Sequence, residues 1–135
     1  YIDNPSEELK LEAVKQKPWV IQLIENPSEE VQIEAVKEDG TSIKYIKEPS
    51  EKVKLEAVKS NPWVIEHIEN QSGEIQWLAV KKQPWVINYI ENPTEELLFF
   101  AIKKILLNGG LDMERIQKLT EIFKELEENK GENHE

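Results

Sequence analysis

The side chains that could carry out chemistry are few, and their spacing matches no common catalytic arrangement. The chain of 135 residues has two histidines and no cysteine, which excludes thiolate zinc sites and cysteine nucleophiles. Its glycine pair, Gly109-Gly110, is not followed by Lys-Ser or Lys-Thr and so does not indicate a phosphate-binding loop. The carboxylates near the C-terminus lack the spacing of a calcium loop. We therefore expect no enzyme activity, no bound metal and no cofactor.

Serine and histidine are also placed as structural residues. Serine recurs at one position ahead of acidic residues, which is typical of helix N-caps and does not favour a Ser-His-Asp triad. These serines are Ser6, Ser28, Ser50 and Ser72. His67 takes a position that elsewhere holds Tyr or Leu, so we expect a half-buried packing side chain with a polar tip. His134 lies in the C-terminal tail.

The overall charge is strongly acidic. The chain has 27 acidic and 17 basic residues, a net charge of −10, which argues against direct binding of nucleic acid. No run of 18 apolar residues is present, so we expect no membrane span, and no signal peptide is visible. These observations predict a cytoplasmic protein.

The elements that position these residues follow from an internal repeat of 22 residues, which occurs five times without an insertion. The repeats begin at Tyr1, Leu23, Tyr45, His67 and Tyr89. Counted within each repeat, position 2 is always Ile, position 13 always Ala and position 15 always Lys. The first two predict packing positions, and the third predicts a surface position.

Each repeat predicts two helical segments. The first follows the Ser or Thr cap and its acidic first turn, and has apolar residues at helical spacing over about 10 residues. Proline ends it in three repeats and begins a short second segment, which is α or 3₁₀ (Pro18, Pro62 and Pro84). A unit of this size cannot bury its own apolar face, whereas stacked units can. The prediction is an all-α protein, with residues 1–110 forming a right-handed α-solenoid of five two-helix repeats.

The run NPSEEVQIEAVK at residues 26–37, with Asn61-Pro62 after the next helix, resembles the leucine-rich repeat variant family. The repeats look still closer to short uncharacterised helical repeats of bacterial and phage proteins. The resemblance covers residues 1–110 and implies helices that alternate with short second helices in a curved superhelix. It implies little about function. The iron–sulfur module sometimes attached to that family is excluded here because the chain has no cysteine.

Two repeats depart from the pattern. Repeat 2 has Gly40-Thr41-Ser42-Ile43 where other repeats have Pro-Trp-Val-Ile, so the tryptophan series skips it. This predicts either a notch in an aromatic edge or, the interpretation we favour, a locally unwound second helix. In repeat 5, residues 97–102 are apolar on nearly all sides, which predicts a helix buried on most sides.

We expect that helix to be covered by a C-terminal capping helix over residues 111–129, with Asp112 as its N-cap. Its apolar face is made of Ile116, Leu119, Ile122, Phe123 and Leu126. Residues 130–135 are expected to be a disordered tail. No cap is visible at the N-terminal end, so we expect either preceding residues or self-association through that end.

Two series of side chains are candidates for binding. The lysines at position 15 form a ladder (Lys15, Lys37, Lys59 and Lys81). Local ion pairs with Glu12, Glu34 and Glu56 are the interpretation we favour for it, and a track for an acidic or mixed-charge partner is the alternative. The tryptophans at position 19 are the first residues to test, because Trp is frequent among interface hot spots (Trp19, Trp63 and Trp85).

The function predicted from these features is a non-enzymatic scaffold that binds a protein or peptide on the curved solenoid surface. One alternative is an acidic, phage-encoded inhibitor that blocks a nucleic-acid-binding or defence protein by presenting carboxylates. A second alternative is a protein that sequesters a small ligand.

Overall fold

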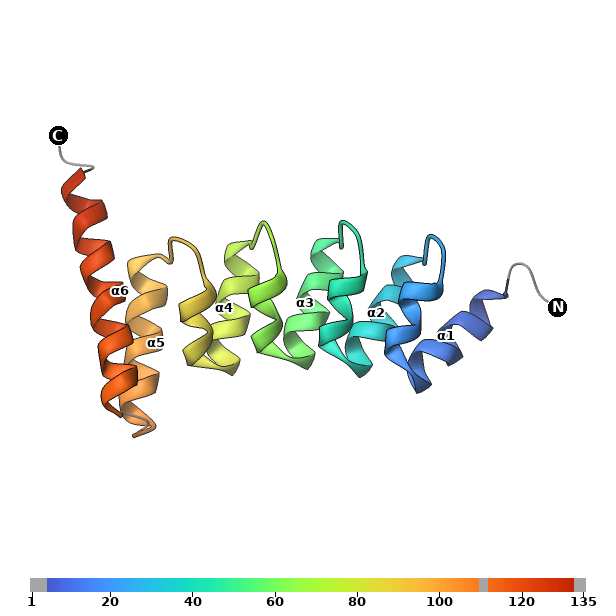
Figure 1. Ribbon diagram of the computed structural model, residues 1–135, viewed down its shortest axis with the longest axis horizontal. Helices are drawn as coiled ribbons and strands as arrows, with labels where there is room; N and C mark the ends of the chain where they lie inside the picture. Colours follow the sequence, from blue (N-terminus) through green and yellow to red (C-terminus); the bar gives the residue numbers. More distant parts are fainter. Residues whose placement is uncertain (1–4, 110–111, 133–135) are drawn as a thin grey trace. The chain divides into compact units, whose positions relative to one another are not determined.

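The computed structural model describes residues 5–109 and 112–132, and these residues form helices and the loops between them (Figure 1). The described α-helices are α1 (Glu7–Gln16), α2 (Glu29–Glu38), α3 (Glu51–Ser60), α4 (Gly73–Lys82), α5 (Glu95–Leu107) and α6 (Met113–Glu132). Between them lie the 3₁₀-helices η1 (Pro18–Leu23), η2 (Gly40–Tyr45), η3 (Pro62–His67) and η4 (Pro84–Tyr89). The helices divide into two compact units at the boundary between Ile90 and Glu91.

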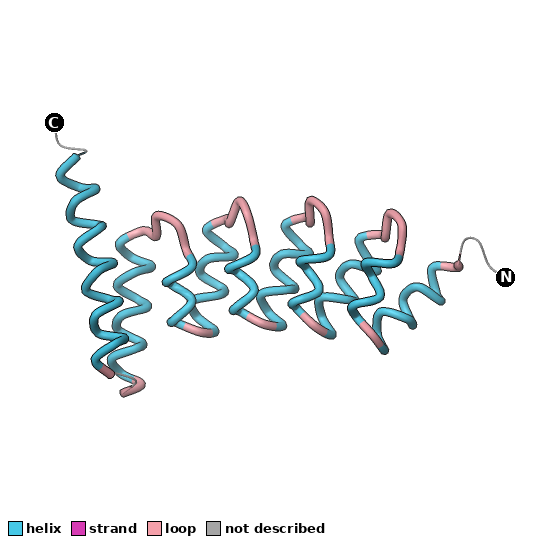
Figure 2. The backbone as a smooth tube through the Cα atoms, viewed as in Figure 1, coloured by secondary structure: helices cyan, strands magenta, loops and turns pink. Residues whose placement is uncertain are grey.

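The first unit has two layers. Helices α1 to α4 contact one another in order and form the α layer, and η1 to η4 contact one another in order and form the 3₁₀ layer. Helices α2, α3 and α4 each contact the 3₁₀-helix of their own repeat and that of the repeat before. Figure 2 shows the loops that join the layers along both edges of this unit. The second segment of repeats 1 to 4 is therefore 3₁₀ and not α. Repeat 5 departs from the expected two helices, because over its described residues α5 continues to Leu107 and no 3₁₀-helix follows it.

The caps predicted from the sequence start the α-helices. The side-chain oxygens of Ser6, Ser28, Ser50, Ser72 and Thr94 each accept the backbone N–H of the residue three positions later. These bonds satisfy donors that have no partner inside the helix. Acidic residues follow in the first turn, where the helix dipole favours them. Proline begins three of the four 3₁₀-helices, as expected.

Each 3₁₀-helix is followed by a turn through a left-handed residue. Positive φ angles of 46° to 53° occur at Asn26, Glu48, Asn70 and Asn92, all at repeat position 4. Asparagine tolerates this conformation better than most residues, which explains its recurrence there. Glu48 is the exception.

Repeat 2 corrects one sequence-based expectation, because the structure has no unwound segment there. Helix η2 spans six residues, as the other 3₁₀-helices do. Asp39 replaces proline as the starting device, since its Oδ1 accepts the Thr41 N–H at 3.0 Å. Gly40 lies against α3, where its N–H donates to Ser60 Oγ at 3.1 Å. Gly40 and the buried Ser42 thus occupy the positions that hold Pro and Val in the other 3₁₀-helices, and the backbone stays helical.

The core of the first unit lies between its two layers. It consists of the same positions in successive repeats, chiefly 9, 13 and 14 of the α-helix and 20 and 21 of the 3₁₀-helix. The first helix differs at position 9: the Leu9 side chain is 49% exposed, whereas Val31, Val53 and Ile75 are 0% exposed. One face of α1 therefore stays open.

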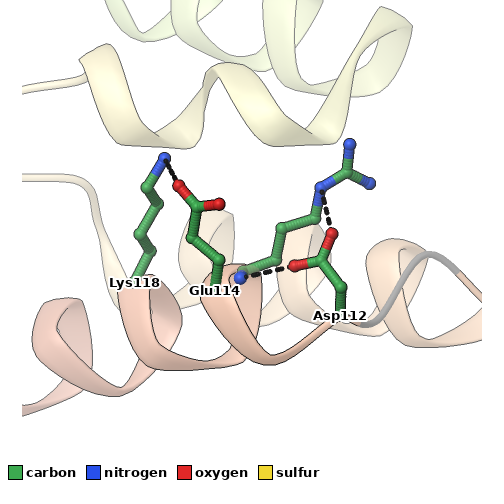
Figure 3. Close-up of polar contacts among 4 residues, drawn as sticks. Asp112, Glu114 and Lys118 are labelled. Carbon is green, nitrogen blue, oxygen red and sulfur yellow. Dashed lines mark hydrogen bonds and ion pairs between the residues drawn. The ribbon is translucent and has the colours of Figure 1, made fainter.

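The second unit consists of α5 and α6. Asp112 starts α6 as predicted, since its Oδ1 accepts the Arg115 N–H at 2.9 Å, and Glu114 pairs with Lys118 at 3.6 Å (Figure 3). The helix is longer than predicted: it continues through Lys130 to Glu132, where a disordered tail was expected. The rest of that tail, residues 133–135, lies outside the described residues.

Helix α5 is less buried than its composition predicts. Its buried residues are Leu97, Leu98, Ala101 and Ile105. Phe99, Leu106 and Leu107 are instead 52% to 70% exposed, so the expectation of burial on most sides was wrong. On α6, Leu119 is buried and Ile122 and Leu126 are half-buried, while the Ile116 side chain lies outside the described residues. Over residues 5–109 and 112–132, no helix has the length and hydropathy needed to cross a membrane.

Candidate protein-binding surface

Four large aromatic side chains are exposed along the 3₁₀ layer. Trp19 is 48% exposed, Tyr45 39%, Trp63 43% and Tyr89 41%. We call these four residues the aromatic row. Each comes from the start or the end of a 3₁₀-helix, whose middle positions turn into the core. The short helix therefore leaves its terminal aromatic side chains on the surface.

The clearest contact within the aromatic row joins two neighbouring repeats. The rings of Trp63 in η3 and Tyr89 in η4 meet edge to face, with centroids 6.1 Å apart and an angle of 75° between their planes. This is a favourable geometry for aromatic pairs, contributing about 0.5–1.5 kcal/mol beyond burial. The pair thus forms an ordered aromatic cluster that still presents a large part of both rings to solvent.

Two amide side chains position this cluster. Asn61 caps η3, since its Oδ1 accepts the Trp63 N–H at 3.1 Å. The Gln71 side-chain nitrogen donates to the carbonyl of Ile65 at 3.0 Å and to that of Tyr89 at 3.4 Å. Gln71 therefore links η3 to the end of η4, which the prolines at the same position in repeats 2, 3 and 5 cannot do. The replacement of proline by Gln71 is visible in the sequence, but it was not interpreted as a link between repeats.

The sequence-predicted tryptophans are only part of the aromatic row. Trp19 and Trp63 belong to it, whereas Trp85 is half-buried in η4. The tyrosines at position 1, Tyr45 and Tyr89, were missed because that position was interpreted as half-buried packing. Their signal was the recurrence of tyrosine at position 1 in alternate repeats, 44 residues apart. At the tryptophan position of repeat 2, the smaller Thr41 is half-buried and its hydroxyl donates to Asp39 Oδ1 at 2.7 Å.

The lysine ladder lies in the other layer. Lys15, Lys37, Lys59 and Lys81 are exposed in the last turns of α1 to α4. The alanines at position 13 of α2 to α4 are fully buried. Each ladder lysine lies two residues after the position-13 alanine of its own helix, which places it about 200° further round the helix. The lysines therefore point away from the core on the α layer. The predicted tryptophans and lysines form two separate surfaces.

The local ion pairs predicted for the ladder are present in part. Glu56 pairs with Lys59 at 3.4 Å, as expected. Glu12 instead accepts a hydrogen bond from Gln16 at 3.2 Å, and Lys81 lies over the Trp77 ring, 5.8 Å from its centroid. Local contacts thus involve two of the four ladder lysines, Lys59 and Lys81, which makes the ladder a weaker candidate for partner binding than the aromatic row.

His67 does not pack as the sequence suggested. Its side chain is exposed at the end of η3, so the expectation of a half-buried residue was wrong. It borders a pocket of about 590 Å³ that is also lined by Glu48, Lys54 and Glu69. Lys54 Nζ donates to the backbone carbonyl of Glu69 at 3.1 Å, so this cation holds a loop in place. In the described part of the chain, no group of three or more His, Cys, Asp or Glu residues could hold a metal ion.

Comparisons with protein-family models, with curated proteins and with solved structures gave no match to this chain. The resemblance to the leucine-rich repeat variant family therefore stays a prediction from the sequence. The functional argument depends on the surfaces themselves.

Proposed function

We propose that this chain is a non-enzymatic scaffold of the α-solenoid class that binds a protein or peptide partner over the aromatic row. The observation that carries the proposal is the exposure of Trp19, Tyr45, Trp63 and Tyr89 on one layer, at 39% to 48% each. Large exposed aromatic side chains that recur in register are typical of interaction surfaces, and Trp and Tyr dominate interface hot spots.

The stacking of the first unit supports the solenoid part of the proposal. Each α-helix contacts the next α-helix, and each 3₁₀-helix contacts the next 3₁₀-helix, so one core runs along the stack. In such stacks each repeat offers the same position to the surface, and a partner can contact several repeats at once. The aromatic row follows this logic at every second repeat: Trp19 and Trp63 share position 19, and Tyr45 and Tyr89 share position 1.

The chemistry around the aromatic row favours a partner with apolar or aromatic groups. The Asp, Glu, Lys or Arg residues within η1 to η4 are Lys44 and Glu66, which are exposed and carry opposite charges. The Lys44 ammonium lies over the Tyr45 ring, 5.4 Å from its centroid. The overall charge of −10 is therefore not concentrated on this surface. Burial of apolar area, with hydrogen bonds to the Trp and Tyr tips, is the expected source of affinity.

The test is a comparison of proteins captured from an extract of the organism that encodes the chain. The double variant W63A/Y89A removes the ring pair, and the matched control K59A/K81A removes two ladder lysines from the α layer. We expect a partner that the wild type and the lysine control capture equally, and that the aromatic variant captures at least tenfold less.

Circular dichroism and thermal melting establish that each variant is folded. If W63A/Y89A does not fold, the single variant W19A tests the same row two repeats away. Equal capture by the aromatic variants, or loss of capture only in K59A/K81A, would contradict the proposal. The second result would assign binding to the lysine ladder.

A further inference from the structure

A groove in the second unit has a composition distinct from the aromatic row. It is a cavity of about 500 Å³ between α5 and α6, and we call it the α5–α6 groove. Its apolar lining comes from Leu98 and Phe99 on α5 and from Phe123 and Leu126 on α6. This volume lies in the range of pockets that hold a specific ligand or a bulky side chain.

The groove exposes two aromatic rings. Phe99 is 70% exposed and Phe123 is 46% exposed, although both lie on helices of the same unit. The residues at the position of Phe99 in the first unit are all half-buried (Leu11, Ile33, Leu55 and Trp77). Helix α6 thus leaves open a ring whose counterparts are partly covered in the stack. Such adjacent exposed apolar side chains mark interaction sites.

The rim of the groove is acidic. Glu95, Glu96 and Glu127 contribute carboxylates, and Lys130 contributes one ammonium group. Lys130 forms an ion pair with Glu95, which links the C-terminal part of α6 to the N-terminus of α5. Within the described part of the chain, Glu96 and Glu127 make no ion pair. Two unpaired negative charges therefore flank the exposed rings.

We propose that the α5–α6 groove binds a basic amphipathic helix of another protein. Aliphatic side chains at helical spacing would contact Phe99 and Phe123, and flanking Lys or Arg residues would pair with Glu96 and Glu127. Charge complementarity selects this occupant, since an acidic partner would be repelled by the same carboxylates. A groove between two helices also matches the ridge of a third helix, which is a recurrent mode of peptide recognition. The proposal is independent of the aromatic row, because the residues of the two surfaces do not overlap.

The experiment uses the full chain and a fluorescein-labelled model peptide, LKKLLKLLKKLLKL, which folds as a basic amphipathic helix. Two control peptides separate the contributions: one has the same composition in an order without an apolar face, and the other has every Lys replaced by Glu. Fluorescence anisotropy measures each affinity. We expect the model peptide to bind at least tenfold more tightly than either control peptide.

Variants of the chain locate the site. E96K/E127K should weaken binding at least tenfold, and so should F99A/F123A, whose side chains are exposed enough that the fold should persist. The matched control is E30K/E74K on α2 and α4, which reverses two exposed glutamates at the same repeat position as Glu96 and changes the net charge by the same amount. It should leave binding within twofold of the wild type, as should W63A/Y89A.

Equal loss of binding in E30K/E74K would overturn the proposal, because it would show attraction to the net charge of the chain alone. Retained binding in F99A/F123A would overturn it as well, since the rings would then not form the site. Thermal melting of each variant shows whether a loss reflects the groove or the fold. If F99A/F123A is unfolded, the single variant F99A tests the more exposed of the two rings.

Discussion

Ser28 at the start of α2 donates a hydrogen bond from its hydroxyl to the carboxylate of Glu7, 21 residues earlier at the start of α1. The same hydroxyl accepts the Val31 N–H at 3.2 Å, so one side chain caps its own helix and ties it to the helix before. Ser72 makes the same two contacts, to Glu51 and to the Ile75 N–H. A hydroxyl can do both because it is one donor and two acceptors. A capping residue thus also sets the register between repeats.

The link between Ser28 and Glu7 should appear as a coupling energy. In a double-mutant cycle of S28A and E7A, we expect about 0.5–1 kcal/mol of coupling in the free energy of unfolding. S28A alone should lose about 1–2 kcal/mol, because the cap is lost as well. Urea denaturation followed by circular dichroism measures each corner of the cycle. The control cycle pairs S28A with E8A, the neighbouring glutamate in the same turn, and should give no coupling. Equal coupling in both cycles would contradict the bond.

The left-handed residue Glu48 offers a stabilising substitution. Its φ of 46° is a conformation in which three other repeats use asparagine. Asparagine adopts this region at a lower conformational energy, so E48N should raise the free energy of unfolding by about 0.5–1 kcal/mol. The reverse substitution N70E, at a φ of 53°, should lower it by a similar amount. Urea unfolding of both variants measures the effect. A destabilised E48N would show that the Glu48 side chain makes a contact worth more than the strain.

Gly40 is required by the close approach of α3. A Cβ atom at this position would lie 2.6 Å from the Ala57 carbonyl oxygen and 3.2 Å from the Asn61 Cβ. The backbone cannot easily move away, so G40A should destabilise the chain by about 1–3 kcal/mol. The matched control is G73A in the first turn of α4, where a Cβ would meet nothing within 4 Å. That variant should be neutral or slightly stabilising, since alanine favours the helix. Thermal melting compares the two, and equal losses would contradict the close approach.

The local features of the helices could be predicted from the sequence. The helix starts depend on residue types within a few positions of one another, and the sequence displays these directly. Examples are the caps at Ser28 and Asp112 and the prolines that begin 3₁₀-helices, Pro18 and Pro62. The choice between α and 3₁₀ could not be predicted, because a six-residue segment is too short to show a helical period.

Exposure was harder to predict than helix formation. A repeat position comes back every 22 residues whether its side chains face the core or solvent, so position 1, which holds Tyr45 and Tyr89, was interpreted as a packing position. The exposure of Phe99 depends on how α6 lies along α5, and composition does not determine that geometry. Both candidate surfaces, the aromatic row and the α5–α6 groove, therefore became visible only in three dimensions.

The open face of α1 predicts that the same chemical change has different effects at two equivalent positions. Leu9 and Ile75 both occupy position 9 of their repeats and have side chains of equal composition. Leu9 is 49% exposed and Ile75 is 0% exposed. We expect I75A to lose about 2–5 kcal/mol of unfolding free energy, because it removes buried methylenes and leaves a cavity. L9A should lose less than about 1.5 kcal/mol, since much of its surface already contacts water.

The measurement is urea denaturation of both variants at two protein concentrations tenfold apart. Similar losses for L9A and I75A, independent of concentration, would show that the face of α1 is covered within one chain. A loss for L9A that grows with protein concentration would instead show that a second copy covers this face, because only association links stability to concentration. That result would support the self-association expected at the N-terminal end, and light scattering of wild type and L9A would then show the dimer and its loss.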